Sequence, residues 1–559
     1  MRSIGFKNFR KFGELPSIAL SPITILVGEN NAGKSTVVKG ILAMNDFLTE
    51  SMDAKTFARL SKEDQARAAK DLVQRGIRFY FNARYHAHLG TFQRALHNKA
   101  RGGTIEFRMD MPNCIEMTVS VKSPEDALGA EAPYGVVQCI CVKWGEDLSL
   151  DLNLEDDMAT LEFLPHDTPA YVPKDESSFA SVLFALEKFH ARLERALVVS
   201  APISPNLAMA LRVGRTEDIV SVLIRSVELS IDAAINSTFD DAARWLQTKE
   251  KDGAYVPLET LPLNLQWAFS RPVSAEGIDE EAKDLLREYM KSVSPGNSPN
   301  VSDLAPRFAL PWYDPADVGT IEYIYAHEVA QTAIYLARNA NDYLSQTIHE
   351  YASKMGQRKH PLVLEWMQRF GIGKDFNIQA IGGEAYLFTV TNLDGTGVDL
   401  SAKGMGSIQL MVLLLRLALF LPTEESKKSP TQPVANTFIM EEPEQNLHPM
   451  LQSKLADLFY ELHTAYGFRF IVETHSEYLV RRSQVIVGEQ YKTQEELDAK
   501  DPFMDAKNPF KVYYFPSEGV PYDMKYTLGG MFEKKFGDGF MNEAGKLHMA
   551  VLKNLKENR

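Results

Sequence analysis

The segment with the clearest chemistry lies near the N-terminus and reads G-E-N-N-A-G-K-S-T over residues 28–36. It has the spacing G-x-x-x-x-G-K-[ST] of a phosphate-binding loop. Glycines at its first and sixth positions let the backbone curl, so that several amide groups point at one phosphate. The lysine supplies a mobile charge for the outer phosphates, and the next serine supplies a hydroxyl for Mg²⁺. The predicted nucleotide-binding residues are Gly28, Asn30, Asn31, Ala32, Gly33, Lys34, Ser35 and Thr36.

Paired carboxylates end an apolar stretch much later in the chain, where residues 437–441 read T-F-I-M-E and Glu442 follows. In many nucleotide hydrolases such a strand lies beside the strand of the phosphate loop. The first carboxylate then holds Mg²⁺ through water, and the second activates the attacking water. We therefore assign Glu441, with Ser35, to Mg²⁺ and Glu442 to catalysis. The alternative is an acidic turn that only favours the N-terminus of the next helix.

A histidine follows another apolar run, Phe468 to Val472, in the segment E-T-H-S-E. A histidine at a strand tip can hydrogen-bond the γ-phosphate of a nucleotide. A lone histidine is more often structural, but His475 comes one strand after the carboxylates, which favours a catalytic role.

A second glycine-containing loop, V-D-L-S-A-K-G-M-G-S-I-Q over residues 398–409, opens an apolar helix at residues 410–421. The N-terminus of a helix can bind an anion. A glycine-rich turn without any ligand would read the same way, so the loop alone is a weak signal. Its candidate residues are Ser401, Gly404, Gly406 and Ser407.

The elements that must position these residues follow from apolar periodicity. We expect strands at residues 4–6, 18–27, 376–381, 385–390, 437–441 and 468–472, short antiparallel strands between residues 104 and 164, and helices at residues 37–85, 175–289, 321–355, 361–370, 410–421 and before Leu555. Arg10 and Lys11, between the first two strands, could reach a bound nucleotide or could form a solvated turn, and the sequence favours neither.

Composition sets outer limits on the function. A chain of 559 residues is long enough for two or three domains. A net charge of −14 argues against a surface that coats nucleic acid. The three cysteines, Cys114, Cys139 and Cys141, lack metal-ligand spacing and are expected to be reduced thiols. The longest apolar run, at residues 410–422, is too short to span a bilayer, and no signal peptide is apparent, so we expect a cytoplasmic protein without membrane contact.

The four motifs, in their order along the chain, resemble the ATP-binding-cassette heads of the SMC, RecF and overcoming-lysogenization-defect group. The segments E-E-P-E-x-x-L-H-P and E-T-H-S are similar to the bacterial defence branch of that group, closest to the Septu ATPases found in Septu and retron antiphage systems. The tail around Gly539 and Phe540 resembles the small C-terminal module of those ATPases. Two positions depart from the group: Glu441 replaces the usual aspartate, and a degenerate loop replaces the L-S-G-G-Q signature.

This resemblance implies an α/β fold, with an ABC-ATPase head made of a P-loop parallel sheet and an antiparallel β lobe, and a large helical insertion. It implies halves of the head at residues 1–174 and 366–559, with an insertion at residues 175–365 for assembly or partner contacts. Two heads would sandwich two ATP molecules, each held by the phosphate loop of one chain and the signature loop of the other. The cofactors would be ATP and Mg²⁺, and the homo-oligomer would be built on head-to-head dimers.

Three functions compete on this basis. The first is the switch subunit of a Septu-type antiphage complex, which regulates a separate HNH nuclease and, in retrons, accompanies a reverse transcriptase and an RNA–DNA hybrid. The second is a RecF-like DNA repair ATPase, which would need a basic surface. The third is a self-contained nuclease of the overcoming-lysogenization-defect type, which would need a D-x-D metal motif after His475. No such motif occurs there, so we favour the first function.

Overall fold

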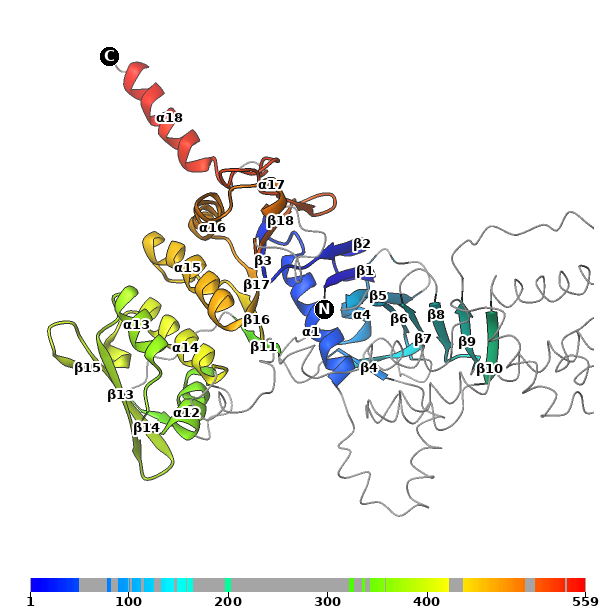
Figure 1. The fold of residues 1–559 in the computed structure, drawn as a ribbon, viewed down its shortest axis with the longest axis horizontal. Coiled ribbons are helices and arrows are strands. Elements are labelled where there is room, and N and C mark those ends of the chain that lie inside the picture. Colours follow the sequence, from blue (N-terminus) through cyan, green and yellow to red (C-terminus); the bar gives the residue numbers. More distant parts are fainter. Residues whose placement is uncertain are drawn as a thin grey trace, which may run out of the picture. The chain divides into compact units, whose positions relative to one another are not determined.

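The computed structural model describes residues 2–49, 78–81, 89–98, 100, 103–111, 115–124, 132–144, 148–156, 158–163, 197–202, 321–325, 334–336, 342–356, 358–421, 436–497, 508–537 and 540–557 (Figure 1). These belong to two compact units. Apart from the first two residues, one unit comprises Ser3–Ser17 and Ala43–Asp314, and the other comprises Ile18–Leu42 and Pro315–Arg559. The prediction of helices over residues 175–289 is wrong at residues 197–202, which form a strand. The rest of that range lies outside the described residues.

An antiparallel sheet dominates the first unit and confirms the strands predicted after residue 104. Its strands are β1 (Ser3–Phe9), β2 (Phe12–Ala19), β4 (Arg78–Tyr80), β5 (Thr104–Met111), β6 (Ile115–Lys122), β7 (Tyr134–Trp144), β8 (Leu148–Asn153), β9 (Met158–Phe163) and β10 (Leu197–Pro202). The order is β10-β9-β8-β7-β6-β5-β1-β2, and β4 pairs with β7. A short helix, α4 (Phe92–Ala95), belongs to the same unit. The helix predicted over residues 37–85 is therefore wrong at β4, which is a strand.

The second unit is built on a sheet with the order β11-β16-β17-β3-β18-β19. Its strands are β3 (Ile23–Gly28), β11 (Ile321–Ile324), β16 (Thr437–Glu441), β17 (Arg469–Glu473), β18 (Phe510–Phe515) and β19 (Tyr522–Asp523). All neighbours are parallel except β18 and β19. The fold class is therefore α/β, as the sequence predicts, with a parallel sheet in one unit and an antiparallel sheet in the other.

Helices and a small second sheet complete this unit. The helices are α1 (Lys34–Thr49), α12 (Tyr343–Met355), α13 (Pro361–Arg369), α14 (Met405–Leu419), α15 (Pro449–Tyr466), α16 (Glu477–Gln490), α17 (Gln494–Leu497) and α18 (Glu543–Glu557), of which α1 ends in the first unit. The small sheet contains β12 (Tyr335–Leu336), β13 (Asp375–Ile381), β14 (Ala385–Thr391) and β15 (Gly397–Asp399). None of the described helices combines the length and the apolar composition that crossing a bilayer requires.

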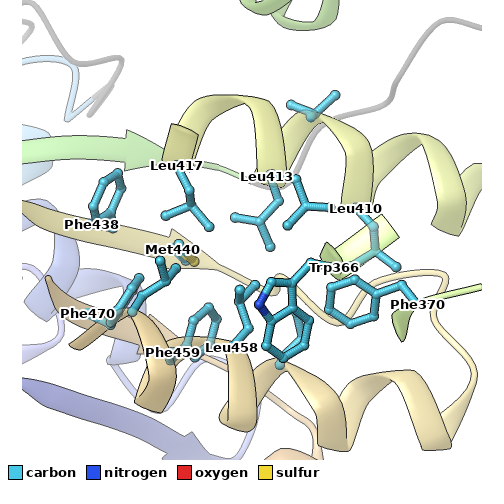
Figure 2. Packing of buried hydrophobic residues seen from close by; sticks show 14 of the residues in the cluster. Trp366, Phe370, Leu410, Leu413, Leu417, Phe438, Met440, Leu458, Phe459 and Phe470 are labelled. Atoms are coloured by element: carbon cyan, nitrogen blue, oxygen red, sulfur yellow. The ribbon is translucent and has the colours of Figure 1, made fainter. Parts of the chain in front are cut away.

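The core of the second unit forms because apolar helix faces cover the apolar strands (Figure 2). Figure 2 shows side chains of α14, α15 and α13 packed together with those of β16 and β17. Phe438 and Phe470 stack at 5.6 Å between ring centroids, and Phe459 stacks on Phe470 at 4.7 Å. The predicted apolar helix is confirmed as α14, which is buried along most of its length. This packing fixes the strands whose ends carry the candidate catalytic residues.

Two predicted elements differ from the structure. The single strand predicted over residues 18–27 is divided between β2 and β3, because the chain turns at Ser21 and Pro22. The amide of Ser21 donates to Thr24 Oγ1 at 2.8 Å in this turn. The helix predicted from residue 321 begins instead as strand β11, which pairs with β16 and extends the parallel sheet. This second difference matters for the site, because β11 brings Tyr323 to the carboxylates.

Candidate functional site: a nucleotide-binding edge of the parallel sheet

The phosphate loop joins the buried strand β3 to the N-terminus of α1, which is the context that the motif requires. Gly28 has φ +141° and Gly33 has φ +107°, conformations that L side chains rarely adopt. A Cβ atom at Gly28 would lie 2.1 Å from the backbone oxygen of Phe515 in β18. The structure therefore adds a reason for this glycine: the neighbouring strand, and not only a bound phosphate, excludes a side chain.

Lys34 lies inside the loop, where its side chain bridges the backbone. Its Nζ donates to the carbonyl oxygens of Gly28 and Glu29, at 3.1 Å and 2.8 Å. Burial lowers the pKa of Lys34, and the carboxylate of Glu473 gives the largest opposing effect. The lysine is thus the cation that faces the carboxylates of the neighbouring strands.

The carboxylates lie at the carboxyl ends of parallel strands, the edge where α/β sheets bind ligands. Glu441 at the end of β16 is in register with Glu473 at the end of β17. The amide of Glu442 donates to the carbonyl oxygen of Glu473 at 2.8 Å, and Glu442 has φ +45°. Such strained backbone is often found at functional sites. However, β16 does not lie beside β3, as expected from other hydrolases, because β17 lies between them.

Glu442 and His475, the two residues that the sequence assigns to catalysis, lie close together at this edge. His475 Nε2 lies 3.9 Å from Glu442 Oε1, while Glu442 Oε2 accepts a hydrogen bond from Gln445 at 2.9 Å. The amide of His475 donates to Glu444 Oε1 at 2.7 Å, which holds the histidine backbone. Burial and the charge of Lys34 lower the pKa of His475, and Glu442 opposes this shift. The imidazole is therefore neutral at neutral pH and can donate one hydrogen bond.

Three residues at this edge were not predicted from the sequence. Glu473 accepts a hydrogen bond from Ser35 at 2.8 Å, so the serine that the sequence assigns to Mg²⁺ contacts this residue. Burial raises the pKa of Glu473 to about 7. Tyr323 lies near Glu441, and burial raises the pKa of Glu441. Glu444 is buried, and its carboxylate accepts a hydrogen bond from the amide of His475. Only the position of Glu473, directly before the T-H-S segment, could have indicated it.

The signature segment lies on the same unit and packs against the loop that follows the paired carboxylates, where Asn446 Nδ2 donates to Gln409 at 3.4 Å. Residues 400–402 form a short 3-10 helix, and Gly404 caps the N-terminus of α14. Lys403 holds the segment through hydrogen bonds to Ile372 and Asn392. A Cβ at Gly406 would lie 2.5 Å from the oxygen of Asn446, whereas one at Gly404 would meet no atom within 4 Å. Gly404 is exposed and Ser401 and Ser407 are half-buried, so a second molecule can reach them.

The residues at the sheet edge fit a nucleotide with a divalent cation. Glu441 Oε1 and Glu473 Oε2 are buried and have no hydrogen-bond partner among the described residues. Carboxylate and hydroxyl oxygens are the ligands that Mg²⁺ prefers. Among the described residues no group of three or more histidine, cysteine or acidic side chains forms a metal site by itself. The buried oxygens of Glu441 and Glu473 and the hydroxyl of Ser35 therefore suit a divalent cation.

The family of AAA ATPase domains matches residues 1–86 and 311–480, which is less than half of the chain. The matched residues include the phosphate loop, the paired carboxylates and His475. This match and the site geometry support an ATPase. An ATPase domain implies that ATP is the bound nucleotide, usually with Mg²⁺. No curated protein matches the chain.

Solved structures of Smc head domains align with the chain at low similarity. The Smc head of Pyrococcus furiosus, with an extended coiled coil and bound to the C-terminal domain of ScpA, is 12% identical over 99% of each chain, with a TM-score of 0.29. The head with a coiled coil and joint of Pyrococcus yayanosii is 12% identical over 98% of this chain and 99% of that one, at 0.30. The SMC head of Thermotoga maritima is 12% identical over 94% and 100%, at 0.28. Likenesses this slight assign neither a fold nor a function to the ATPase.

Proposed function

We propose that the chain is the ATP-dependent switch subunit of a bacterial antiphage defence complex, which regulates a separate HNH nuclease through pairing of two ATPase heads. The observation that carries the ATPase part is the convergence of the phosphate loop, Glu442 and His475 at one edge of the parallel sheet. The defence role rests on the resemblance of the E-E-P-E-x-x-L-H-P and E-T-H-S segments to Septu-type ATPases.

Each residue has a definite role in this proposal. Lys34 and the loop amides bind the phosphates. Ser35 and Glu441 would hold Mg²⁺, which neutralises charge on the phosphates when it is bound. Glu442 accepts a proton from the attacking water, and its contact with Gln445 orients it. His475, neutral and 3.9 Å from Glu442, donates to the terminal phosphate and reports its presence.

Pairing of two heads explains why the signature segment is open to a second molecule. In the closed dimer, the residues Ser401 to Ser407 of one chain complete the nucleotide site of the other. ATP shifts the equilibrium toward this dimer only if it binds the closed state more tightly than the open one. Hydrolysis removes that preference and releases the heads.

Replacement of Glu442 by Gln tests the hydrolytic role. We expect E442Q to bind ATP with wild-type affinity and to lose hydrolysis by about 100-fold or more, because the amide cannot accept the proton of water. Phosphate release and equilibrium nucleotide binding are measured on the same preparations. Glu495→Gln, a similar change in the first turn of α17, serves as the control. Wild-type turnover in E442Q would contradict the assignment.

Partner capture tests the defence role. The tagged chain is purified from its native host with and without ATP, and its partners are identified by mass spectrometry. We expect an HNH nuclease, and in a retron also a reverse transcriptase and hybrid nucleic acid. Recovery of recombination proteins instead would support a RecF-like repair ATPase, and DNA cleavage by the chain alone would reveal a nuclease site of its own.

A further inference from the structure

Strand β17 lies between the strand of the phosphate loop and the strand of the paired carboxylates. Its last residue, Glu473, is in register with Leu26 of β3 and with Glu441 of β16. The backbone around it is bonded on both sides: the amide of Thr474 donates to Leu26 at 3.0 Å, and the amide of Glu442 donates to Glu473 at 2.8 Å. The side chain of Glu473 therefore starts from a fixed point in the middle of the site.

Glu473 is buried, with 5% of the residue exposed, and its two carboxylate oxygens have different surroundings. Oε1 accepts a hydrogen bond from Ser35 at 2.8 Å. Oε2 is buried and has no partner among the described residues. Lys34 is the nearby cation, but its Nζ donates to two backbone carbonyls of the loop. A buried carboxylate oxygen without a hydrogen-bond partner lowers the free energy of unfolding. The fold therefore keeps Glu473 at a cost in stability.

A second unsatisfied oxygen lies on the neighbouring strand. Glu441 Oε1 is also buried without a hydrogen-bond partner among the described residues. Glu441 and Glu473 are in register on adjacent strands, and each has one carboxylate oxygen without a hydrogen-bond partner among the described residues. Together with the hydroxyl of Ser35, which bonds Glu473, they form a set of hard oxygen ligands. A divalent cation would offset the charge of both carboxylates, which the nearby lysines Lys34 and Lys39 offset only in part.

We propose that Glu473 is an additional residue of the magnesium site, which uses Oε2 for the cation that accompanies the nucleotide and Oε1 to hold Ser35 in place. The proposal rests on the ATPase function above, because the cation arrives with the nucleotide. Mg²⁺ is commonly bound by one or two carboxylates together with substrate phosphates, and Glu441 with Glu473 would be such a pair. The residue that follows in sequence, Thr474, leads directly to His475, so the cation and the phosphate-sensing histidine share one strand end.

The variant Glu473→Gln separates this role from a structural one. Glutamine keeps the size of the side chain and can still accept the hydrogen bond from Ser35, but it carries no charge for a cation. We measure binding of the β,γ-imido analogue of ATP to the full chain by calorimetry, across a titration of Mg²⁺. The Mg²⁺ concentration for half-maximal binding is expected to rise by about 10- to 100-fold, the usual effect of losing a group that supports a metal.

In the absence of Mg²⁺, Glu473→Gln is expected to bind the analogue at least as well as wild type, because one negative charge facing the phosphates is gone. A merely structural role would weaken binding equally with and without the cation. Glu477→Gln, which removes a charge four residues away that pairs with Arg481 at 2.5 Å, is the matched control and should behave as wild type.

An unchanged Mg²⁺ requirement in folded Glu473→Gln would overturn the proposal. If that variant does not fold, Glu473→Asp replaces it, since a shorter side chain cannot bond Ser35 and also reach the cation. An unchanged requirement in Glu473→Asp would equally overturn the proposal. Failure of the wild-type chain to bind the analogue at any Mg²⁺ concentration would instead refute the ATPase function, so the two failures are distinguishable.

Discussion

Lys34 and the acidic side chains near it set the electrostatics of the site at the scale of single residues. Burial lowers the pKa of Lys34 and raises the pKa of Glu441 and Glu473. The charges of Lys34 and Glu473 oppose these shifts in each other, and the charge of Lys39 opposes the shift of Glu441. Perturbed pKa values of this kind cluster at functional sites. A bound phosphate brings further negative charge, so we expect the positive charge of Lys34 to contribute strongly to nucleotide binding.

The replacement Lys34→Ala is expected to weaken ATP binding by about 100-fold or more, since it removes the positively charged side chain that we place against the phosphates. It also removes two hydrogen bonds to the loop carbonyls, so the fold must be verified by thermal unfolding. Nucleotide affinity is measured by calorimetry, with Lys492→Ala, an exposed lysine, as the control. Equal affinity in wild type and Lys34→Ala would contradict the site assignment.

His463, in the last turn of α15, gives a prediction on pH. Burial lowers its pKa from 6.5, while the carbonyl oxygen of Phe468, 2.9 Å from Nδ1, opposes the shift. The unfolded chain therefore binds the proton more tightly, and stability falls as the pH drops through 6.5 toward the folded pKa. The loss is about 1.4 kcal/mol for each pKa unit of difference.

Thermal unfolding from about pH 7 to about pH 5 checks this linkage. In His463→Gln the decrease of stability toward acid pH should be smaller than in wild type, because glutamine does not titrate. His548→Gln, at an exposed position of α18, should retain the wild-type slope. An identical slope in His463→Gln would show that other groups dominate the acid range.

At the scale of elements, the close contact between β3 and β18 leaves no room for a side chain at Gly28, the first residue of the phosphate loop. Gly28→Ala would bring a Cβ to 2.1 Å from the oxygen of Phe515. We expect a loss of stability of about 2 kcal/mol or more without any nucleotide present, because the backbone must shift or take up strain. Denaturant unfolding measures this loss. Gly404→Ala, at an open glycine, should be neutral, and a neutral Gly28→Ala would disprove the steric argument.

The sequence predicts the elements of the site better than their order. The strands that carry Glu441 and His475 follow from apolar runs with chemical residues at their ends, and both are confirmed. β11 was mistaken for a helix because four residues carry too little periodicity against the helical pattern that follows. The sequence does not indicate Glu473, because its partner Ser35 is 438 residues away. No local pattern predicts which strand lies next to β3.

At the scale of the whole molecule, the predicted dimer can be tested through Gly404. E442Q is expected to form dimers when ATP is present, because it retains ATP without hydrolysing it. Gly404 is exposed and no atom lies within 4 Å of an added Cβ, so a large side chain should fold there. The double variant E442Q/Gly404→Trp should therefore remain monomeric with ATP, since the indole would fill the space that the partner's nucleotide needs.

Size-exclusion chromatography with light scattering distinguishes these states, and nucleotide affinity is measured in parallel. E442Q/Gly404→Ala is the matched control and should still dimerise. If the tryptophan variant dimerises with ATP as E442Q does, the signature segment does not lie at the interface, and pairing of heads must use another surface.

The position of β3 in the middle of its sheet also has a consequence for biosynthesis. Residues Ile23 to Gly28 pair with β18 at residues 510–515 and with β17 at residues 470–473, so the first strand of this sheet to be synthesised pairs with strands that are synthesised much later. Pairings between such distant segments form slowly, and an unpaired apolar strand invites aggregation meanwhile. The nucleotide site can therefore assemble only after β18 has been translated. A ribosome that stalls before that point leaves an incomplete chain without an assembled nucleotide site.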